Sequence, residues 1–354
     1  IGGAEKRFAG LWVDLKRSGD RDVHLVVPRS LFDELVRAVD LSHLASFVDQ
    51  ATIVEDDGQN TMRKLRVTLS WLRVRHPNAV FHFTLLPPTL IGLIRPARTV
   101  YTVAGSTLTG VNWKGMAAIG SSVALAARTD VLDEGVANML RGLFPHKREH
   151  ISVTPNSFVD LETYQPAAVK KNRLVFTGLF SREKQIDRLV DCLPELDAGL
   201  RAGGIASPEY RFMGRETRSP GVAEAVAALR PKIDVQAGYE PNPIGTLAEG
   251  KVFFSIQFTN NYPSKALLEA MACGCVPIVT DVGTTRKIAR DDFAHFVPRE
   301  FTAKDLLPGA LAALSLSKPD FEKRVATMRQ FCAQNFSLAS MRAYYQGLWA
   351  QAST

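Results

Sequence analysis

Cysteine is scarce in this chain of 354 residues, which holds four of them: Cys192, Cys273, Cys275 and Cys332. The Cys-x-Cys pair at 273–275 has no second pair at the spacing that a structural zinc ion needs, so no zinc site is predicted. We therefore expect all four to be small buried thiols in a reducing compartment.

Long apolar runs are missing as well. No uninterrupted apolar run reaches about 18 residues, the length at which a membrane-spanning helix becomes a candidate. No signal peptide is visible. The chain begins at Ile1 rather than at a methionine, so we expect upstream residues that include the first strand of the fold. These features predict a cytoplasmic protein that can also bind peripherally to the inner face of a membrane.

Several familiar catalytic motifs are absent. Gly105 and Gly110 stand at the spacing of a phosphate-binding P-loop, but Val111 and Asn112 replace its lysine and its serine or threonine. No Gly-x-Gly-x-x-Gly follows a strand, and no Gly-x-Ser-x-Gly occurs. The seven histidines include no pair at metal-ligand spacing. The sequence thus predicts none of these sites and no metal site.

Acidic residues are missing from one long block, 58–129, although the whole chain has a net charge of only +7. The block contains nine basic residues: Arg63, Lys64, Arg66, Arg73, Arg75, Arg95, Arg98, Lys114 and Arg128. Such a block attracts phosphates, acidic glycans or anionic lipid. In its densest part, Met62, Leu65, Leu69 and Leu72 recur at helical spacing. Two interpretations stay open: a packed helix with a solvated basic face, or a surface that contacts a membrane or an anionic acceptor.

Apolar β runs alternate with helical segments along the chain. We expect strands at 22–28, 51–57, 79–86, 98–105, 150–158, 173–180, 210–216, 233–239, 252–258 and 277–283. We expect helices at 2–19, at 30–40 with Ser30 as N-cap, and at 61–77, 184–196, 221–232 and 264–272, followed by a long helical tail. The segment 244–250 connects two of the strands.

Helices placed between apolar strands indicate parallel sheets that are covered on both faces. A chain of 354 residues is long enough for two domains. We predict an α/β protein with two Rossmann-like, doubly wound domains, at 1–157 and 158–335, that face each other across a cleft. The helix at 336–354 is expected to pack back on the first domain. Ligands of such sheets bind at the carboxyl ends of the strands.

Two candidate phosphate-binding elements begin helices. Gly2 and Gly3 let the backbone approach a phosphate at a helix N-terminus, although a plain loop glycine pair has the same pattern. Arg182 and Lys184 follow the strand at 173–180, where two cations could neutralise a diphosphate. A solvated loop is the alternative for that pair.

Two further strands end in a glycine followed by a side chain that could contact a ring. Gly214 and Arg215 follow the strand at 210–216, and Gly238 and Tyr239 follow the next strand. Glycine at a strand end permits a flat ring to lie against the backbone, and tyrosine can stack on that ring.

The most informative stretch is Asn260 to Gly283, "NNYPSKALLEAMACGCVPIVTDVG". Ser264 is the predicted N-cap of a helix whose first turn, Lys265 to Leu267 with Ala266 between them, offers free N–H groups to a phosphate. Glu269 is the one acid in an apolar helix, and its carboxylate can accept two hydrogen bonds from the vicinal diol of a ribose. The alternative for Glu269 is a lone acid that faces water.

Residues 261–283 resemble the donor-site signature of the family 4 retaining glycosyltransferases, enzymes of the two-Rossmann-domain GT-B fold. "GGAEKRFAG", "ISVTPNSFVDLETYQP" and "LVFTGLFSREKQID" resemble the opening loop, the interdomain segment and the phosphate-binding loop of that family. The resemblance covers essentially the whole chain, in order.

The resemblance implies roles for individual residues. Glu269 matches the second of two signature glutamates and would hold the donor ribose, whereas the first falls on Asn261. Lys184 matches the usual lysine, but Leu179 stands where an arginine is usual, and Arg182 would substitute for it. Ala104 replaces a histidine that usually contacts the sugar. His82, at a neighbouring strand end, would line the cleft.

The activity implied by the resemblance is transfer of a sugar from a nucleoside-diphosphate donor, with retention of anomeric configuration and without a metal. The donor would bind at 158–335, and Lys184 and Arg182 would neutralise the departing diphosphate. No cofactor is needed besides the donor, whose base stays open between the UDP and GDP types.

The implied acceptor is a glycan or lipid-linked glycan of cell-surface polysaccharide or glycolipid synthesis. It would sit on the first domain, where the basic 61–98 region could contact an anionic membrane. Nucleic acid is not an expected partner. Two alternatives remain: a nucleotide-sugar epimerase on the same fold, and a non-catalytic nucleotide- or glycan-binding protein with a degraded donor site.

Overall fold

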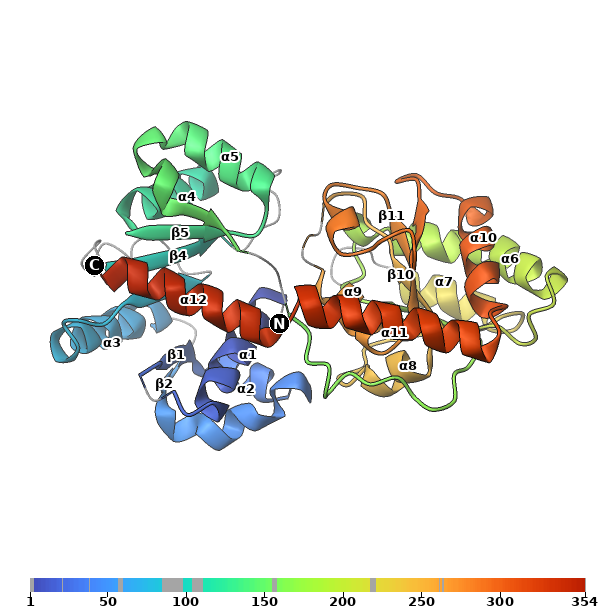
Figure 1. Ribbon diagram of the computed structural model, residues 1–354, viewed down its shortest axis with the longest axis horizontal. Helices are drawn as coiled ribbons and strands as arrows, with labels where there is room; N and C mark the ends of the chain where they lie inside the picture. The colour runs from blue at the N-terminus through green and yellow to red at the C-terminus, as the bar shows by residue number, and fades with distance from the viewer. Residues whose placement is uncertain are drawn as a thin grey trace. The chain divides into compact units, whose positions relative to one another are not determined.

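The computed structural model describes residues 3–20, 22–37, 39–56, 60–84, 98–103, 111–154, 158–216, 221–260, 262 and 264–353. Helices alternate with strands in the described parts, and every strand pair found there is parallel (Figure 1). The chain divides into two compact units: unit 1 holds Ile1–Ser157 with Leu338–Thr354, and unit 2 holds Phe158–Ser337. The predicted α/β class is therefore confirmed. No helix within the described ranges is long and apolar enough to cross a membrane.

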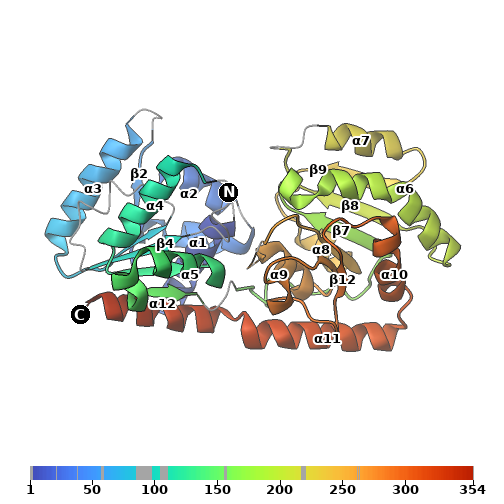
Figure 2. The same cartoon turned by 90° about the horizontal axis from the view of Figure 1, so that it is seen from above.

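Unit 1 contains two parallel sheets, of order β1-β2 and β3-β4-β5-β6. Its strands are β1 (Leu25–Pro28), β2 (Ala51–Val54), β3 (Phe81–Thr84), β4 (Thr99–Val103), β5 (Arg128–Val131) and β6 (Ile151–Val153). Its helices are α1 (Gly3–Arg17), α2 (Arg29–Val36), α3 (Thr61–Arg75), α4 (Trp113–Leu125), α5 (Glu134–Leu143) and α12 (Leu338–Ser353), with 3₁₀ turns at Val39–Gln50 and Pro145–His150. Helix α12 lies along unit 1 in both views and contacts α1, β4 and β5 (Figures 1 and 2).

The hydrophobic core of unit 1 is divided between its two sheets. One cluster joins β3–β6 to α3, α4 and α5, and the other joins β1 to α1 and α2. Every residue of β4 is buried, which agrees with its continuous β-forming sequence. The predicted helix at 2–19 is confirmed by α1, which is followed by Gly19 at a φ of +86°, a conformation that favours glycine.

Two sequence predictions about the helices of unit 1 are wrong. Ser30 does not cap α2, because the N-cap position is Pro28 and the Ser30 hydroxyl instead donates a hydrogen bond to Asp56. Met62, expected on the packed side of α3, is 37% exposed. The other three residues expected on that side, Leu65, Leu69 and Leu72, are buried. The sequence analysis also missed β5, because its polar residues conceal a strand that is nearly all buried.

Unit 2 is built on one six-stranded parallel sheet of order β12-β11-β10-β7-β8-β9. Its strands are β7 (Arg173–Thr177), β8 (Glu209–Met213), β9 (Asp234–Gly238), β10 (Val252–Ser255), β11 (Val276–Thr280) and β12 (His295–Val297). Its helices are α6 (Ile186–Ala202), α7 (Val222–Leu229), α8 (Ile244–Glu249), α9 (Lys265–Ala272), α10 (Ala303–Leu314) and α11 (Lys318–Asn335). Both β10 and β11 are buried along their whole length, and one continuous core joins the sheet to its helices.

Candidate functional site

The predicted donor-site residues of unit 2 follow neighbouring strands of the same parallel sheet. Arg182 and Lys184 follow β7, Arg215 follows β8 and Tyr239 follows β9, while α9 begins after β10. Because the strands are parallel, their carboxyl ends lie at one edge of the sheet. The fold therefore brings these residues to one edge, as the sequence predicted.

The loop after β7 is held in place by its neighbours. It contains a 3₁₀ turn at Arg182–Lys184, followed by Gln185 in the left-handed conformation at a φ of 47°. The buried Gln185 amide donates a hydrogen bond of 3.0 Å to the Arg299 carbonyl, after β12. The Glu183 carbonyl accepts a hydrogen bond of 2.9 Å from the Phe258 N–H, after β10. These contacts fix the backbone that carries both predicted cations.

Lys184 is half-buried, whereas the neighbouring Arg182 is exposed. Burial lowers the pKa of the Lys184 amine to about 8, and the charge of Glu183 opposes that effect. The amine is therefore still protonated in most molecules at neutral pH, but its cation is incompletely solvated. A bound diphosphate would restore the missing stabilisation of this charge.

Gly214 allows the ends of β7 and β8 to approach each other closely. A Cβ atom at Gly214 would lie 2.0 Å from the Gly178 carbonyl oxygen and 2.5 Å from the Phe180 ring. The Gly214 N–H also donates a hydrogen bond of 2.9 Å to the Gly238 carbonyl. We expected a flat ligand ring to lie against Gly214, but protein atoms fill the space on its Cβ side. Gly238, by contrast, has no atom within 4 Å of the position of a Cβ.

Arg215 and Tyr239 form a contact that the sequence analysis did not foresee, although it selected both residues. The guanidinium carbon of Arg215 lies 3.9 Å from the centroid of the Tyr239 ring. The arginine is exposed and the tyrosine is 57% exposed. The pair presents a cation and a flat ring together at the edge of the sheet.

Helix α9 begins as predicted, with the Ser264 hydroxyl accepting a hydrogen bond of 3.4 Å from the Leu267 N–H. Glu269 is only 7% exposed, so the alternative of an acid that faces water is wrong. The Lys265 ammonium lies 3.5 Å from the Glu269 carboxylate and 5.1 Å from the Phe158 ring centroid. Glu269 therefore forms an ion pair with a cation on its own helix.

The opposite end of α9 is fixed by two cations that sequence reasoning missed. The Lys170 ammonium donates hydrogen bonds of 2.8 Å to the Gly250 carbonyl and 2.6 Å to the Cys273 carbonyl. The Arg329 guanidinium, on α11, donates to the Ala272 carbonyl. Cations at a helix C-terminus complement its dipole. Since both residues lie far from α9 in the sequence, no local pattern could have indicated them.

The side chain of Asn260 joins two loops that follow strands. Its side-chain oxygen accepts hydrogen bonds from the Tyr262 N–H at 3.3 Å and from both the N–H and the hydroxyl of Thr284 at 3.2 Å. At Gly283, with a φ of +55°, a Cβ would lie 2.4 Å from the Asn260 side chain. The loop that leads to α9 is thereby tied to the loop after β11.

Some predicted site residues cannot be placed. Gly2, Ala104 and Asn261 lie outside the described residues, whereas Gly3 opens α1 as predicted. Leu179, where the resemblance expects an arginine, is 51% exposed. The described residues contain no cluster of histidine, cysteine, aspartate and glutamate that could hold a metal ion.

His82 was expected to line a cleft, but it is enclosed within unit 1, with a side chain that is 11% exposed. Its Nε2 atom lies 2.7 Å from the Thr102 hydroxyl, and its Nδ1 accepts a hydrogen bond of 3.2 Å from the Trp349 indole. The prediction failed because α12, distant in the sequence, covers this strand. Burial and the nearby charge of Arg7 lower the pKa of His82 to about 3, so the ring is neutral.

The same enclosed cluster contains two buried ionisable groups. Arg7 is 3% exposed and donates hydrogen bonds to the hydroxyls of Thr154 and, at 2.9 Å, Tyr345. Asp130 is fully buried and accepts hydrogen bonds from Thr102 and, at 2.9 Å, Tyr345. Burial raises the pKa of the Asp130 carboxyl, an effect that these hydrogen bonds and the charge of Arg7 oppose. Tyr345, on α12, therefore links the two groups.

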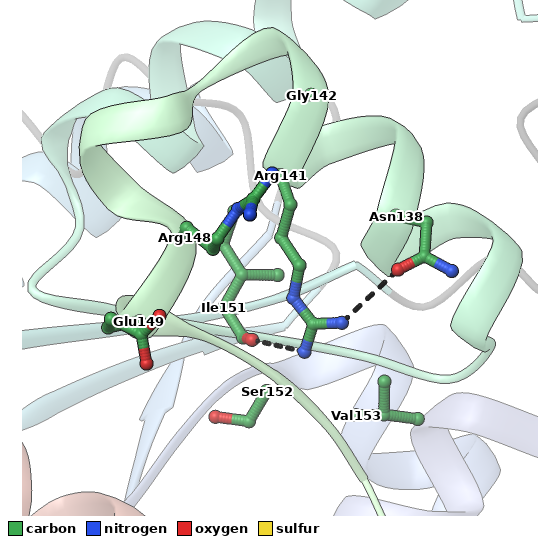
Figure 3. Close-up of a pocket in the computed structure, with 8 residues that line it drawn as sticks. All are labelled: Asn138, Arg141, Gly142, Arg148, Glu149, Ile151, Ser152 and Val153. Atoms are coloured by element: carbon green, nitrogen blue, oxygen red, sulfur yellow. Dashed lines mark hydrogen bonds between the residues drawn. The ribbon is translucent and has the colours of Figure 1, made fainter.

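A depression of about 750 Å³ lies beside the edge strand β6 of unit 1 (Figure 3). Figure 3 shows Arg141 beside it, with hydrogen bonds of 2.9 Å to the Ile151 carbonyl and 3.4 Å to Asn138. The guanidinium is also paired with Glu134. None of the sequence-predicted site residues lines this depression, so it is not the candidate site.

No protein-family profile matches the chain, and no curated protein matches its sequence. Solved structures do match its fold. HepE from Anabaena, solved with UDP and glucose, has a TM-score of 0.72 at 10% identity, over 99% of this chain and 96% of its own. A glycosyltransferase from Rickettsia africae has a TM-score of 0.68 at 13% identity, over 93% of this chain and 98% of its own.

A mutant of TarM from S. aureus, solved with fondaparinux, α-GlcNAc-glycerol and UDP, has a TM-score of 0.62 at 14% identity, over 81% of this chain and 59% of its own. At these identities the matches establish a shared fold. The predicted GT-B fold class, with two Rossmann-like domains, is thereby confirmed.

Proposed function

We propose that the protein is a retaining glycosyltransferase of the family 4 type, which binds a nucleoside-diphosphate sugar at the carboxyl edge of the unit 2 sheet. One observation carries this proposal. Lys184 and Arg182, the Arg215–Tyr239 pair and the first turn of α9 follow four strands of one parallel sheet. That edge is where doubly wound sheets bind their ligands.

The reaction as proposed depends on electrostatic stabilisation of the leaving diphosphate. The cations at Arg182–Lys184 and the N-terminus of α9 meet the negative charge that develops there. They supply positive charge from the chain itself, so we propose transfer without a metal. Glu269 would accept hydrogen bonds from the ribose hydroxyls, and Lys265 forms an ion pair with its carboxylate. Asn261 would contact the sugar in place of the usual glutamate.

We propose UDP rather than GDP as the nucleotide product. HepE and TarM, which share the fold, were solved with UDP. The acceptor proposed is a glycan or lipid-linked glycan of cell-surface polysaccharide or glycolipid synthesis, bound by unit 1. The lack of acids in 58–129 supports an acceptor that carries phosphate or carboxylate groups.

The test is acceptor-dependent release of nucleotide from a panel of UDP- and GDP-sugars. We expect one UDP-sugar to release UDP only when an acceptor is added, and the product to keep the anomeric configuration of the donor. Release that does not depend on the acceptor would indicate hydrolysis and contradict transfer. Conversion of the donor sugar without any release would favour an epimerase.

The ribose assignment has its own test. Glu269→Ala should weaken binding of UDP by about tenfold to a hundredfold, because the hydrogen bonds between a charged carboxylate and the ribose are lost. Isothermal titration calorimetry measures the affinity. Glu195→Ala, which changes an exposed acid on α6, is the control. An unchanged affinity in Glu269→Ala would remove Glu269 from the site.

A second candidate function is binding without turnover. It is favoured by one observation, the exposed apolar side chain of Leu179 at the position where the family usually has an arginine. A protein of this kind would bind UDP in the calorimeter but release no nucleotide from any donor. Leu179→Arg would then be expected to create activity.

A further inference from the structure

Helix α3 has a second apolar face that the core does not use. Leu65, Leu69 and Leu72 are buried and belong to the core side of the helix. Val67, Trp71 and Val74 are 64%, 52% and 75% exposed. Their spacing of four and three residues places them on one stripe, turned away from the leucines by about half a turn. Figures 1 and 2 show α3 at the periphery of unit 1.

Cations border this stripe on both sides. Helix α3 contains no acid and five basic residues: Arg63, Lys64, Arg66, Arg73 and Arg75. The Arg75 guanidinium carbon lies 5.0 Å from the centroid of the Trp71 ring. A nearby acid, Glu55, pairs with Arg29 at 2.7 Å. The surface is therefore positive around an apolar centre.

The first of the two open interpretations does not explain this arrangement. A packed helix with a solvated basic face accounts for the leucines and the arginines, but it predicts polar residues in the middle of the outer face. Single exposed apolar residues are normal on protein surfaces. Three on one stripe, one of them a tryptophan, mark an interaction surface.

We propose that this face of α3 docks on an anionic lipid bilayer. Val67, Trp71 and Val74 would enter the interfacial region, where tryptophan is favoured, and the arginines would meet the lipid phosphates. The cations complement anionic headgroups, and the apolar stripe can insert among the lipids, so the two features together fit a bilayer. A soluble polyanion would pair with the cations but would not bury the apolar stripe. The inference does not depend on sugar transfer, since binding to vesicles needs neither donor nor acceptor.

The experiment is flotation of the full chain with vesicles of phosphatidylcholine alone and of phosphatidylcholine with phosphatidylglycerol, at low and at high salt. We expect binding to the anionic vesicles at low salt, weaker binding at high salt, and a blue shift of tryptophan fluorescence that is lost in Trp71→Phe. Absence of binding to anionic vesicles at low salt would overturn the proposal.

Two triple variants separate charge from apolar insertion. Arg63→Gln, Arg66→Gln and Arg73→Gln together should weaken vesicle binding about 100-fold, at about fivefold for each charge. The matched control carries the same loss of charge at exposed lysines of unit 2, in Lys232→Gln, Lys304→Gln and Lys323→Gln. An equal loss in both variants would show that net charge alone drives binding, and would overturn the proposal.

The apolar variant carries Val67→Ser, Trp71→Ser and Val74→Ser, and should weaken vesicle binding about tenfold or more. Its control, Leu143→Ser with Val169→Ser, changes side chains that are 59% and 76% exposed elsewhere, and should bind as the parent does. Far-UV circular dichroism checks that each variant is folded. If the apolar variant binds vesicles and heparin as tightly as the parent does, the partner is a soluble polyanion and the membrane proposal is wrong.

Discussion

Polar residues lie within the parallel strands of unit 1 and in the loops directly after those of unit 2, and the two units use them differently. In unit 1, Asp130 and His82 are enclosed with Arg7 beneath Tyr345 of α12. In unit 2, the residues at the strand ends include exposed cations and an exposed ring, Arg215 with Tyr239. A polar or charged residue in or directly after a parallel strand is thus enclosed in one unit and exposed in the other.

This difference shows that the role of such a polar residue depends on whether another helix packs over it. The helix α12 comes from the far end of the sequence and satisfies the buried groups of unit 1 through hydroxyl and indole hydrogen bonds. In unit 2, the loops around Lys184 are fixed by backbone contacts, which leave the side chain at the edge of the sheet. An enclosed cluster contributes to stability, and an open one is available to a ligand.

The largest expected effect tests the enclosed cluster. Asp130→Ala should lower the free energy of unfolding by about 2–6 kcal/mol, because the buried hydroxyls of Thr102 and Tyr345 lose their acceptor, at about 1–3 kcal/mol each. Urea denaturation measures the change. The control Glu195→Ala, at an exposed position on α6, should change it by less than about 0.5 kcal/mol. A similarly small effect in Asp130→Ala would mean that the enclosed cluster of unit 1 does not contribute to stability.

The second prediction concerns the open edge. Lys184→Ala should lower kcat/KM by about 10²–10³, as for the loss of one group that stabilises transition-state charge. The free energy of unfolding should not fall, since the lysine cation is poorly solvated in the folded protein. Steady-state release of UDP gives the rate. The control is Lys232→Ala, which lies just before β9 and thus at the amino edge of the sheet, and it should have the activity of the parent. If Lys184→Ala lowered stability and left the activity unchanged, Lys184 would have a structural role.

The third prediction separates architecture from ligand binding within unit 2. Gly214→Ala should cost about 1–3 kcal/mol of stability, because its Cβ would overlap the Gly178 carbonyl. Gly238→Ala meets open space and should leave the melting temperature nearly unchanged. If Gly238→Ala nevertheless weakens UDP binding, the open space beside Tyr239 belongs to the nucleotide pocket. Equal melting temperatures for both variants would contradict the close approach at Gly214.

The smallest effect is a pH dependence. Since the pKa of Lys184 is about 8, affinity for UDP should be constant below that pH and fall by about tenfold for each unit above it. Lys184→Arg should remove this dependence, which titrations at increasing pH would reveal. In the free protein the sign is opposite. Stability should rise with pH between about 8 and the ordinary value of 10.5, where only the unfolded chain binds the proton.

The sequence sufficed for elements whose signals are local. Ser264 as a helix cap and Glu269 on a buried helix could be predicted, because the evidence lies within a few residues of each. The α/β class followed from the alternation of apolar runs. By contrast, β5 was missed because a buried strand whose acid is satisfied by distant hydroxyls does not resemble an apolar run.

Long-range packing could not be predicted. Lys170 and Arg329 reach the end of α9 from distant segments. The enclosure of His82 depends on α12. The close approach of Gly214 to the loop after β7 depends on the positions of the Gly178 carbonyl and the Phe180 ring. In each case the residues adjacent in the sequence are compatible with several roles. The role is determined by residues that are distant in the sequence and close in the folded structure.

The division of unit 1 into two stretches of sequence has a consequence for synthesis on the ribosome. Leu338–Thr354 leaves the ribosome after the whole of unit 2, so the hydroxyl of Tyr345 reaches Arg7 and Asp130 last. Until then a nascent chain holds two ionisable groups whose final partner has not yet been made. A chain that is cut short before α12 would keep both groups without the Tyr345 hydroxyl, and Arg7 and Asp130 would hold only their bonds to Thr154 and Thr102.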